Sequence, residues 1–152
     1  MAITTREARE EILDELASAV ESLALALACL GKAYEAVSVT AADRLEAGIY
    51  SPVQRAYGRA MRAHSAFARF AGFEPRAFEQ PSAGRTSQGA KAFIERAVEA
   101  CAVADGTLSE LQDSMKPTEF GDPELRAGLV EVRGLLAGVP RAAREFLRTL
   151  GR

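Results

Sequence analysis

Histidine and cysteine are scarce in this sequence, which has one histidine, His64, and two cysteines, Cys29 and Cys101, among its 152 residues. A single histidine excludes metal sites built from several imidazoles, and the lack of a Glu-x-x-His motif excludes a ferritin-like di-iron centre. We therefore predict neither a metal ion nor another cofactor. Two cysteines this far apart fit a reducing cytoplasm better than a disulfide framework.

Long hydrophobic runs are also missing. The most apolar stretch, residues 23–31, is far shorter than the roughly 20 residues that a membrane-spanning helix needs. Residues 1–15 are charged almost from the start and lack the apolar core of a signal peptide. The net charge is only −2, so no overall field attracts nucleic acid or an anionic membrane. We expect a cytoplasmic protein with neither of these partners.

Alanine, by contrast, is abundant, and β-branched residues are few. Alanine is the best helix former because it loses no side-chain entropy in a helix. Hydrophobic residues make up 48% of the chain and charged residues 26%, which is typical of a globular protein. A chain of this length is the size of one domain, so we predict a single all-α domain spanning residues 1–152.

Apolar residues recur at spacings of three and four along most of the chain, which predicts amphipathic helices. They predict four helical arms over residues 5–38, 41–50 together with 52–71, 87–116, and 123–150. A long loop rich in proline and glycine separates the second arm from the third. The other two connections are short, which favours an antiparallel, up-down-up-down four-helix bundle.

Capping and helix-breaking residues mark the ends of the arms. Thr4 and Thr40 are predicted N-caps, because each hydroxyl precedes a helical pattern. Ser51 and Pro52 restart the pattern as a cap followed by proline in the first turn, so we expect the second arm to be broken there. Pro140 should kink the fourth arm, because its ring clashes with the preceding turn.

The first arm is apolar on nearly every side around residues 22–31, and such a helix needs a cover on every side. The cover is either the segment 41–50 folding back or a second copy of the chain. We predict a homodimer through a strip that points away from the inward seam, called here the outer strip. Its members are Leu25, Cys29, Ala33 and Ala36.

Arg59 and His64 have the Arg-x4-His spacing of the HEPN ribonucleases, which are compact helical bundles, and the sequence resembles that family in these two residues. The resemblance implies an RNA-cleaving or nucleotide-binding site. Ala60 stands where the family usually has a polar residue. On a regular helix, residues five apart point about 140° apart, so the two side chains meet only where a bend intervenes. The alternative is a histidine at the edge of the core, bonded to Glu10 or Asp14.

Several phenylalanines are expected to converge on one end of the bundle, beneath the long loop. They form either a hydrophobic plug or an aromatic pocket for an apolar ligand. The members of this set are Phe67, Phe70, Phe73, Phe78 and Phe93.

Arginines also line one flank of the fourth arm, among them Arg126, Arg133 and Arg144. Acidic residues line a flank of the first arm. We expect these two flanks to face each other and to select the neighbouring helix.

No nucleophile constellation, metal set or glycine-rich phosphate loop occurs in the sequence. The prediction is therefore a non-enzymatic helical bundle that acts through protein–protein contacts and associates with itself. A HEPN-like nuclease using Arg59 and His64 is the first alternative, and a carrier of an apolar ligand at the phenylalanine-rich end is the second.

Overall fold

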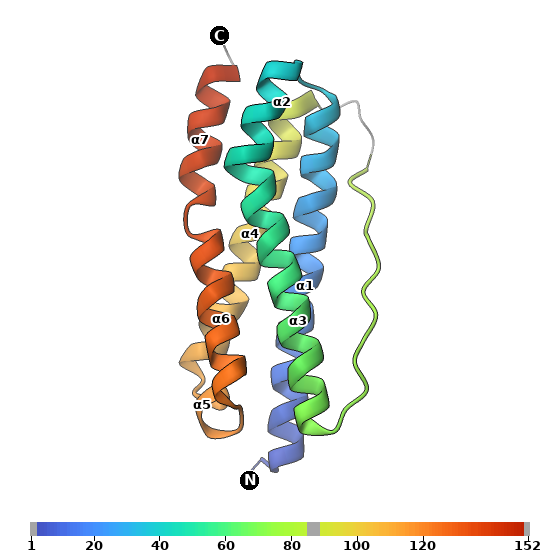
Figure 1. Cartoon of the computed structure of the whole chain (residues 1–152), viewed down its shortest axis with the longest axis vertical. Coiled ribbons are helices and arrows are strands. Elements are labelled where there is room, and N and C mark those ends of the chain that lie inside the picture. Colours follow the sequence, from blue (N-terminus) through green and yellow to red (C-terminus); the bar gives the residue numbers. More distant parts are fainter. Residues whose placement is uncertain (1–2, 85–88, 151–152) are drawn as a thin grey trace.

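A computed structural model describes residues 3–84 and 89–150, and this part of the chain contains helices and no strand. Four arms lie along the long axis of an elongated bundle (Figure 1). The first is α1 (Thr5–Glu35), and the second joins α2 (Val39–Leu45), the π-helical turn η1 (Glu46–Tyr50) and α3 (Ser51–Ala71). The third is α4 (Gly89–Asp113) with the short α5 (Lys116–Glu119), and the fourth is α6 (Pro123–Leu136) with α7 (Val139–Leu150). The predicted all-α helical bundle is confirmed.

The cap of the first arm lies where predicted, but the cap of α2 does not. The hydroxyl of Thr4 accepts a hydrogen bond from the Glu7 amide at 3.1 Å. α1 ends at Glu35 rather than at residue 38, and Ser38 then caps α2 by accepting from the Ala41 amide at 3.2 Å. The prediction of Thr40 as the cap is wrong, because the helix has already begun at Val39.

The second arm is not broken at Ser51. Ser51 has helical backbone angles, and its amide bonds to the carbonyl of Glu46, five residues back. The arm therefore continues through one π-helical turn. Pro52 explains the turn, because its ring has no N–H and clashes with the carbonyl four residues back in a regular α-helix. Widening the preceding turn accommodates the proline without ending the helix.

The fourth arm is interrupted just before Pro140, where a kink was predicted. Ala137 and Gly138 form a turn between α6 and α7, so the arm consists of two helices rather than one bent helix. Proline cannot donate to the carbonyl four residues back, and glycine is a poor helix former, so the helix stops before both. The predicted third arm, 87–116, ends earlier, at Asp113, and Ser87 lies outside the described residues.

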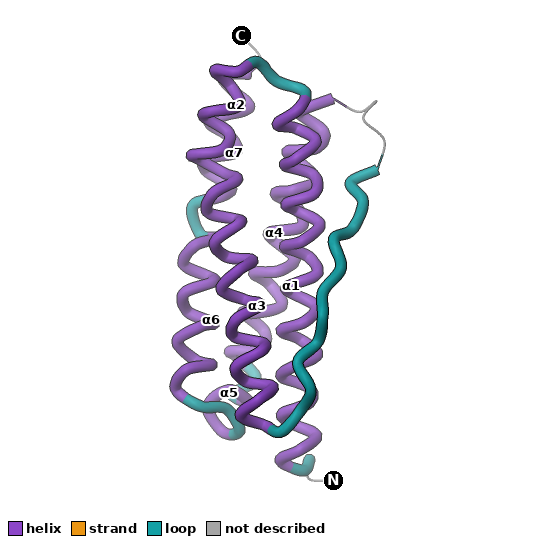
Figure 2. Tube along the Cα trace, turned by 45° about the vertical axis from the view of Figure 1, so that its right-hand side comes forward, coloured by secondary structure: helices purple, strands orange, loops and turns teal. Residues whose placement is uncertain are grey.

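The connection after α3 runs along the whole bundle instead of turning back at one end. α3 ends at Gly72, which adopts a left-handed conformation with φ of 81°. Residues 73–84 then run beside α1 to the opposite pole, where α4 begins (Figures 1 and 2). α3 and α4 are therefore parallel, and the order of the arms is up-down-down-up. The predicted up-down-up-down order is wrong in this respect.

Chain length permits this crossing. The 16 residues from 73 to 88 can span about 50 Å at roughly 3.3 Å per residue, whereas the 25 residues of α4 rise about 38 Å. Neighbouring arms remain antiparallel, because α1 packs against α3 and α4, and α6 packs against the same two helices. α1 and the fourth arm thus lie across a diagonal. No helix in the described ranges is long and apolar enough to cross a membrane.

The bundle has two ends, or poles. The α5 pole holds the start of α1, the end of α3 and α5, and the α2 pole holds the end of α1, α2 and the end of α7 (Figure 1).

Candidate functional site

Residues 73–84, here called the strap, cover the outer side of α1 (Figure 2). Arg76 pairs with Asp14 of α1. Ala77, Phe78, Glu79 and Pro81 line a shallow depression together with Glu21 of α1. At its far end, the carbonyl of Ala83 accepts a hydrogen bond of 2.6 Å from Arg96 of α4. The strap therefore follows α1 from the α5 pole towards the α2 pole.

The outer strip is largely covered within a single chain. Cys29 and Ala33 are fully buried, Leu25 is half-buried against the core, and only Ala36 is exposed. The segment 41–50 contacts α1, and Glu46 and Tyr50 line one depression with residues at the end of α1. α4 packs closely along α1, and the strap lies over the face that bears Asp14 and Glu21. Cys29 and Ala33 are therefore enclosed within one chain and do not form the exposed strip that the predicted homodimer requires.

His64 lies beneath the strap, with 1% of its surface exposed. Its ring lies nearly perpendicular to that of Phe78 in the strap, with an interplanar angle of 87° and a centroid distance of 5.2 Å. Neither ring nitrogen has a hydrogen-bond partner within the described chain. The predicted bond to Glu10 or Asp14 is therefore not formed, and Asp14 pairs with Arg76 instead. Burial lowers the pKa of His64, the nearby Arg76 lowers it further, and Asp14 partly opposes both effects.

Arg59 points to a different neighbour. Its Nε lies 2.6 Å from a carboxylate oxygen of Glu131 on α6, and its guanidinium group lies against Gly128. α3 remains a regular helix between Arg59 and His64, so no bend brings the two side chains together. The accessible Arg–His pair that the HEPN resemblance implies is not formed in this structure.

The two thiols are also enclosed. Cys29 and Cys101 are free and buried. Burial raises the pKa of Cys101 to about 12. Burial also raises the pKa of Cys29, although the charge of Arg96 acts in the opposite direction. Since the thiolate is the nucleophile, both cysteines are poorly suited to nucleophilic chemistry.

The phenylalanines do not converge on one end. Phe67, Phe70 and Phe73 lie at the α5 pole, where Phe67 and Phe70 stack at 5.8 Å. Phe93 lies near the start of α4 at the other pole, because α4 runs parallel to α3. Phe78 sits in between, in the strap.

At the α5 pole, guanidinium groups lie over Phe70 and Phe73, although Phe70 is still 51% exposed. The guanidinium group of Arg6 lies 4.4 Å from the ring centre of Phe73, and that of Arg9 lies 5.0 Å from Phe70. These contacts correspond to a plug capped by cation–π interactions.

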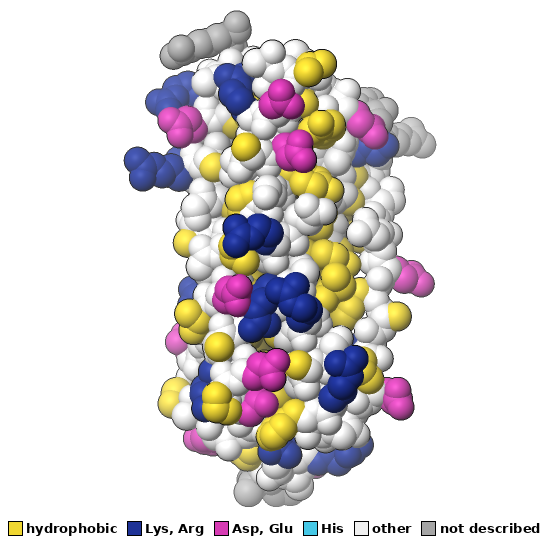
Figure 3. All heavy atoms as spheres, in the orientation of Figure 1, with side chains coloured by type: hydrophobic (Ala, Val, Ile, Leu, Met, Phe, Trp, Pro, Cys, Tyr) yellow, Lys and Arg dark blue, Asp and Glu magenta, His cyan; other side chains and the backbone are white. Residues whose placement is uncertain are grey.

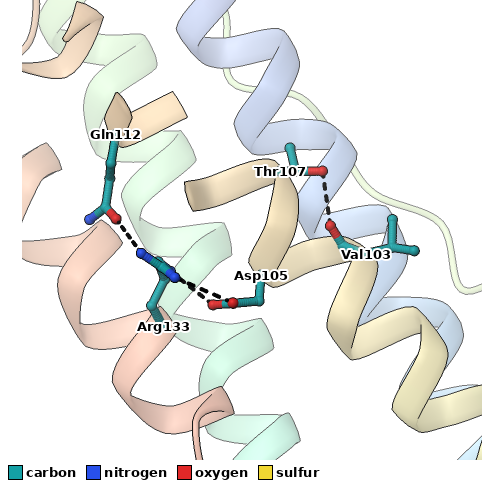
Figure 4. A network of polar contacts seen from close by, with 5 residues as sticks. All are labelled: Val103, Asp105, Thr107, Gln112 and Arg133. Atoms are coloured by element: carbon teal, nitrogen blue, oxygen red, sulfur yellow. Dashed lines mark hydrogen bonds and ion pairs between the residues drawn. The ribbon is translucent and has the colours of Figure 1, made fainter. Parts of the chain in front are cut away.

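Arg133 links the fourth arm to the third through side-chain hydrogen bonds. It donates to Asp105 at 2.9 Å and to Gln112 at 2.8 Å, both on α4 (Figure 4). The prediction that this flank faces the acidic flank of the first arm is wrong for Arg133, because α6 and α1 lie across the diagonal. The side-chain bond to Asp105 raises the pKa of Arg133.

An open depression of about 280 Å³ lies at the α2 pole, between the end of α1 and η1. It is lined by Gly31, Tyr34, Glu35, Glu46 and Tyr50. Tyr34 is 41% exposed, and Val39 at the start of α2 is 81% exposed. Sequence reasoning did not find this site, because its residues come from two arms and no single pattern joins them.

A basic surface lies on α7 at the same pole. Arg141, Arg144 and Arg148, with Glu145, line a depression of about 380 Å³. Arg148 approaches Glu145 at 3.5 Å, whereas Arg141 and Arg144 form no ion pair with any described residue. Lys and Arg side chains project on the upper left in Figure 3, where α7 lies, and Asp and Glu side chains show at the upper front.

Among residues 3–84 and 89–150, no group of three or more His, Cys, Asp or Glu side chains is arranged to hold a metal ion. No protein-family description matches the chain, and no curated protein or solved structure is significantly similar to it.

Proposed function

We propose that the protein is a non-enzymatic helical module that acts through contacts with other protein chains and associates with a second copy of itself at the α2 pole. The enclosure of its reactive side chains supports the non-enzymatic part. His64, Cys29 and Cys101 are the groups best suited to acid–base or nucleophilic work at neutral pH, and all three are buried.

The proposed contact surface rests on one observation: two open surfaces of opposite charge lie at the same pole. Glu35 and Glu46 line the first, which lies at the C-terminal end of α1. The partial negative charge of that helix end also favours a cation. The arginines of α7 form the second surface.

A two-fold axis would let each copy place its α7 arginines at the acidic depression of the other. Because each chain carries both surfaces, the same contact between opposite charges forms twice in the dimer. No surface is left over to bind a third copy. Tyr34 and Val39 add exposed apolar surface beside the depression. Burying it contributes about 25 cal/mol per Å². Glu35 already lies 3.8 Å from Lys32, which leaves Glu46 as the freer carboxylate.

Charge reversal tests the proposal by sedimentation velocity at micromolar concentration. Wild type should form a dimer that weakens as salt is added, because salt screens exposed charges. Glu46→Arg and Arg144→Glu should each give monomers, since each places like charges opposite one another. An equal mixture of the two variants should form dimers again, because every contact then joins opposite charges.

Glu99→Arg serves as the matched control, because Glu99 is an exposed carboxylate on α4 that lines neither depression. It should leave the dimer unchanged. A wild-type protein that stays monomeric, or two variants that fail to complement each other, would refute self-association at this pole.

A further inference from the structure

The strap is held to the bundle by few contacts. Of its twelve residues, 73–84, only Phe73, Phe78 and Ala83 turn inwards, at regular intervals of five. Two polar ties lie at its first residue, where the Phe73 amide bonds to the Ala68 carbonyl at 2.8 Å and Arg6 lies over the Phe73 ring. The ties further along are the Arg76–Asp14 pair and the bond from Arg96 to the Ala83 carbonyl. Segments with few buried apolar contacts open more readily than the core they cover.

His64 is a buried polar residue beneath the strap that lacks hydrogen-bond partners. Most polar groups buried in a protein interior have a hydrogen-bond partner, and those without one call for an explanation. His64 is the only buried polar or charged residue in the described chain, and both its ring nitrogens lack a bond. The neutral ring tolerates the contact with Phe78, but an imidazolium there would be a buried charge without a hydrogen-bond acceptor.

The charged groups around His64 do not remove the free-energy cost of a buried imidazolium. Arg76 of the strap opposes protonation, and Asp14 of α1 favours it. These two groups neutralise each other by pairing. Burial remains the largest influence and lowers the pKa of His64 below its ordinary value of 6.5.

We propose that the strap is an acid-released latch: protonation of His64 expels Phe78, frees the strap from α1 and α3, and uncovers the outer strip around Leu25 and Cys29. Hydrophobic side chains already show along the seam between α3 and the strap on the right of Figure 3. Release exposes the apolar face that the strap hides at neutral pH. The latch is independent of the contact surface at the α2 pole.

The direction of the pH effect follows from proton linkage. In the open state His64 titrates near 6.5, whereas in the closed state its pKa is lower. Between these two values the open state binds more protons, so the closed state loses stability as the pH falls below about 6.5. If His64 titrates only in the open state, the opening equilibrium rises about thirtyfold between about pH 8 and about pH 5.

Cys29 reports on opening, because it is fully buried and lies near Arg96, which holds the end of the strap. We would measure its reaction with 4,4′-dithiodipyridine in a Cys101→Ala background, relative to free cysteine at each pH. The relative rate should rise by roughly an order of magnitude or more towards pH 5. Far-UV circular dichroism should stay constant over this range.

Three variants calibrate the measurement. His64→Phe keeps an aromatic contact with Phe78 and should abolish the rise, and His64→Leu is a second test of the same point. Phe78→Ala removes the central anchor of the strap and should give fast modification at neutral pH. In a Cys29→Ala background, Cys101 should stay unreactive throughout, since it lies in the core between the helices.

Several results would overturn the latch. These are a flat wild-type rate, a rise that persists in both His64 variants, and a loss of helical signal that accompanies the rise. Slow modification of Phe78→Ala at every pH would show that the strap does not cover Cys29, and would overturn it as well.

Discussion

At the scale of single residues, two glycines of α6 show where the arms approach closely. A methyl group on Gly128 would lie 3.1 Å from the Cβ of Ala63 and 3.1 Å from a guanidinium nitrogen of Arg59, both on α3. On Gly134 it would meet no neighbouring atom within 4 Å. Packing therefore requires a glycine at the first position and not at the second.

We expect Gly128→Leu to lower the free energy of unfolding by about 1–3 kcal/mol, because the larger side chain overpacks the α3–α6 contact. Gly134→Ala should raise it by about 0.5–1 kcal/mol, because alanine restricts the unfolded chain and favours helix. Urea denaturation monitored by circular dichroism measures both. Destabilisation of similar size in the two variants would contradict the close approach at Gly128.

At the scale of helical elements, local signals located most helix ends but misplaced the start of α2. Ser38 and Thr40 are both plausible caps, only two residues apart. The structure selects Ser38, whose hydroxyl accepts from the Ala41 amide. Thr40 then lies inside the first turn of the helix. Capping patterns identify the region of a helix start but do not choose between adjacent hydroxyl residues.

Alanine substitutions distinguish these two residues. Ser38→Ala should lower the free energy of unfolding by about 0.5–2 kcal/mol, the usual cost of losing an N-cap. Thr40→Ala should be neutral or slightly stabilising, because alanine is the better helix former. Thermal or urea unfolding would measure the difference. A larger loss for Thr40→Ala would mean that α2 begins two residues later, after a cap at Thr40.

At the scale of the whole molecule, the strap decides which ends of the arms meet. With α4 antiparallel to α1, Lys116 lies 2.6 Å from Glu11 at the α5 pole. Their side-chain bond raises the pKa of Lys116. In the up-down-up-down order α4 would run parallel to α1, and these residues would lie at opposite ends of a helix about 45 Å long.

A zero-length carbodiimide cross-linker should therefore join Lys116 to Glu11 within one chain, as detected by mass spectrometry of the digested monomer. Lys91 and Glu95 lie one turn apart on α4, with 3.8 Å between their charged atoms. Their cross-link should form in either topology and confirms that the reaction works. Finding the second link without the first would contradict the crossing of the strap.

The helical content, the four arms and the Thr4 cap could be predicted from the sequence, because they depend on neighbours three or four residues away. The site at the α2 pole could not, since Tyr34 and Glu46 come from different arms. His64 was expected at the edge of the core, and it lies buried there with 1% of its surface exposed. Its missing hydrogen bond could not be predicted, because Phe78 contacts its ring from the strap and Arg76 of the strap pairs with Asp14.

The sequence by itself determined that this chain forms helices and which face of each helix is apolar, since both follow from residue type and spacing. The order of the arms was decided only by the tertiary structure. A connection of 16 residues, 73–88, is long enough either to loop back at one pole or to cross to the other. Crossing covers the outer face of α1, which is apolar on nearly every side, and so removes apolar surface from water. That gain belongs to the assembled bundle and is not encoded in any one segment.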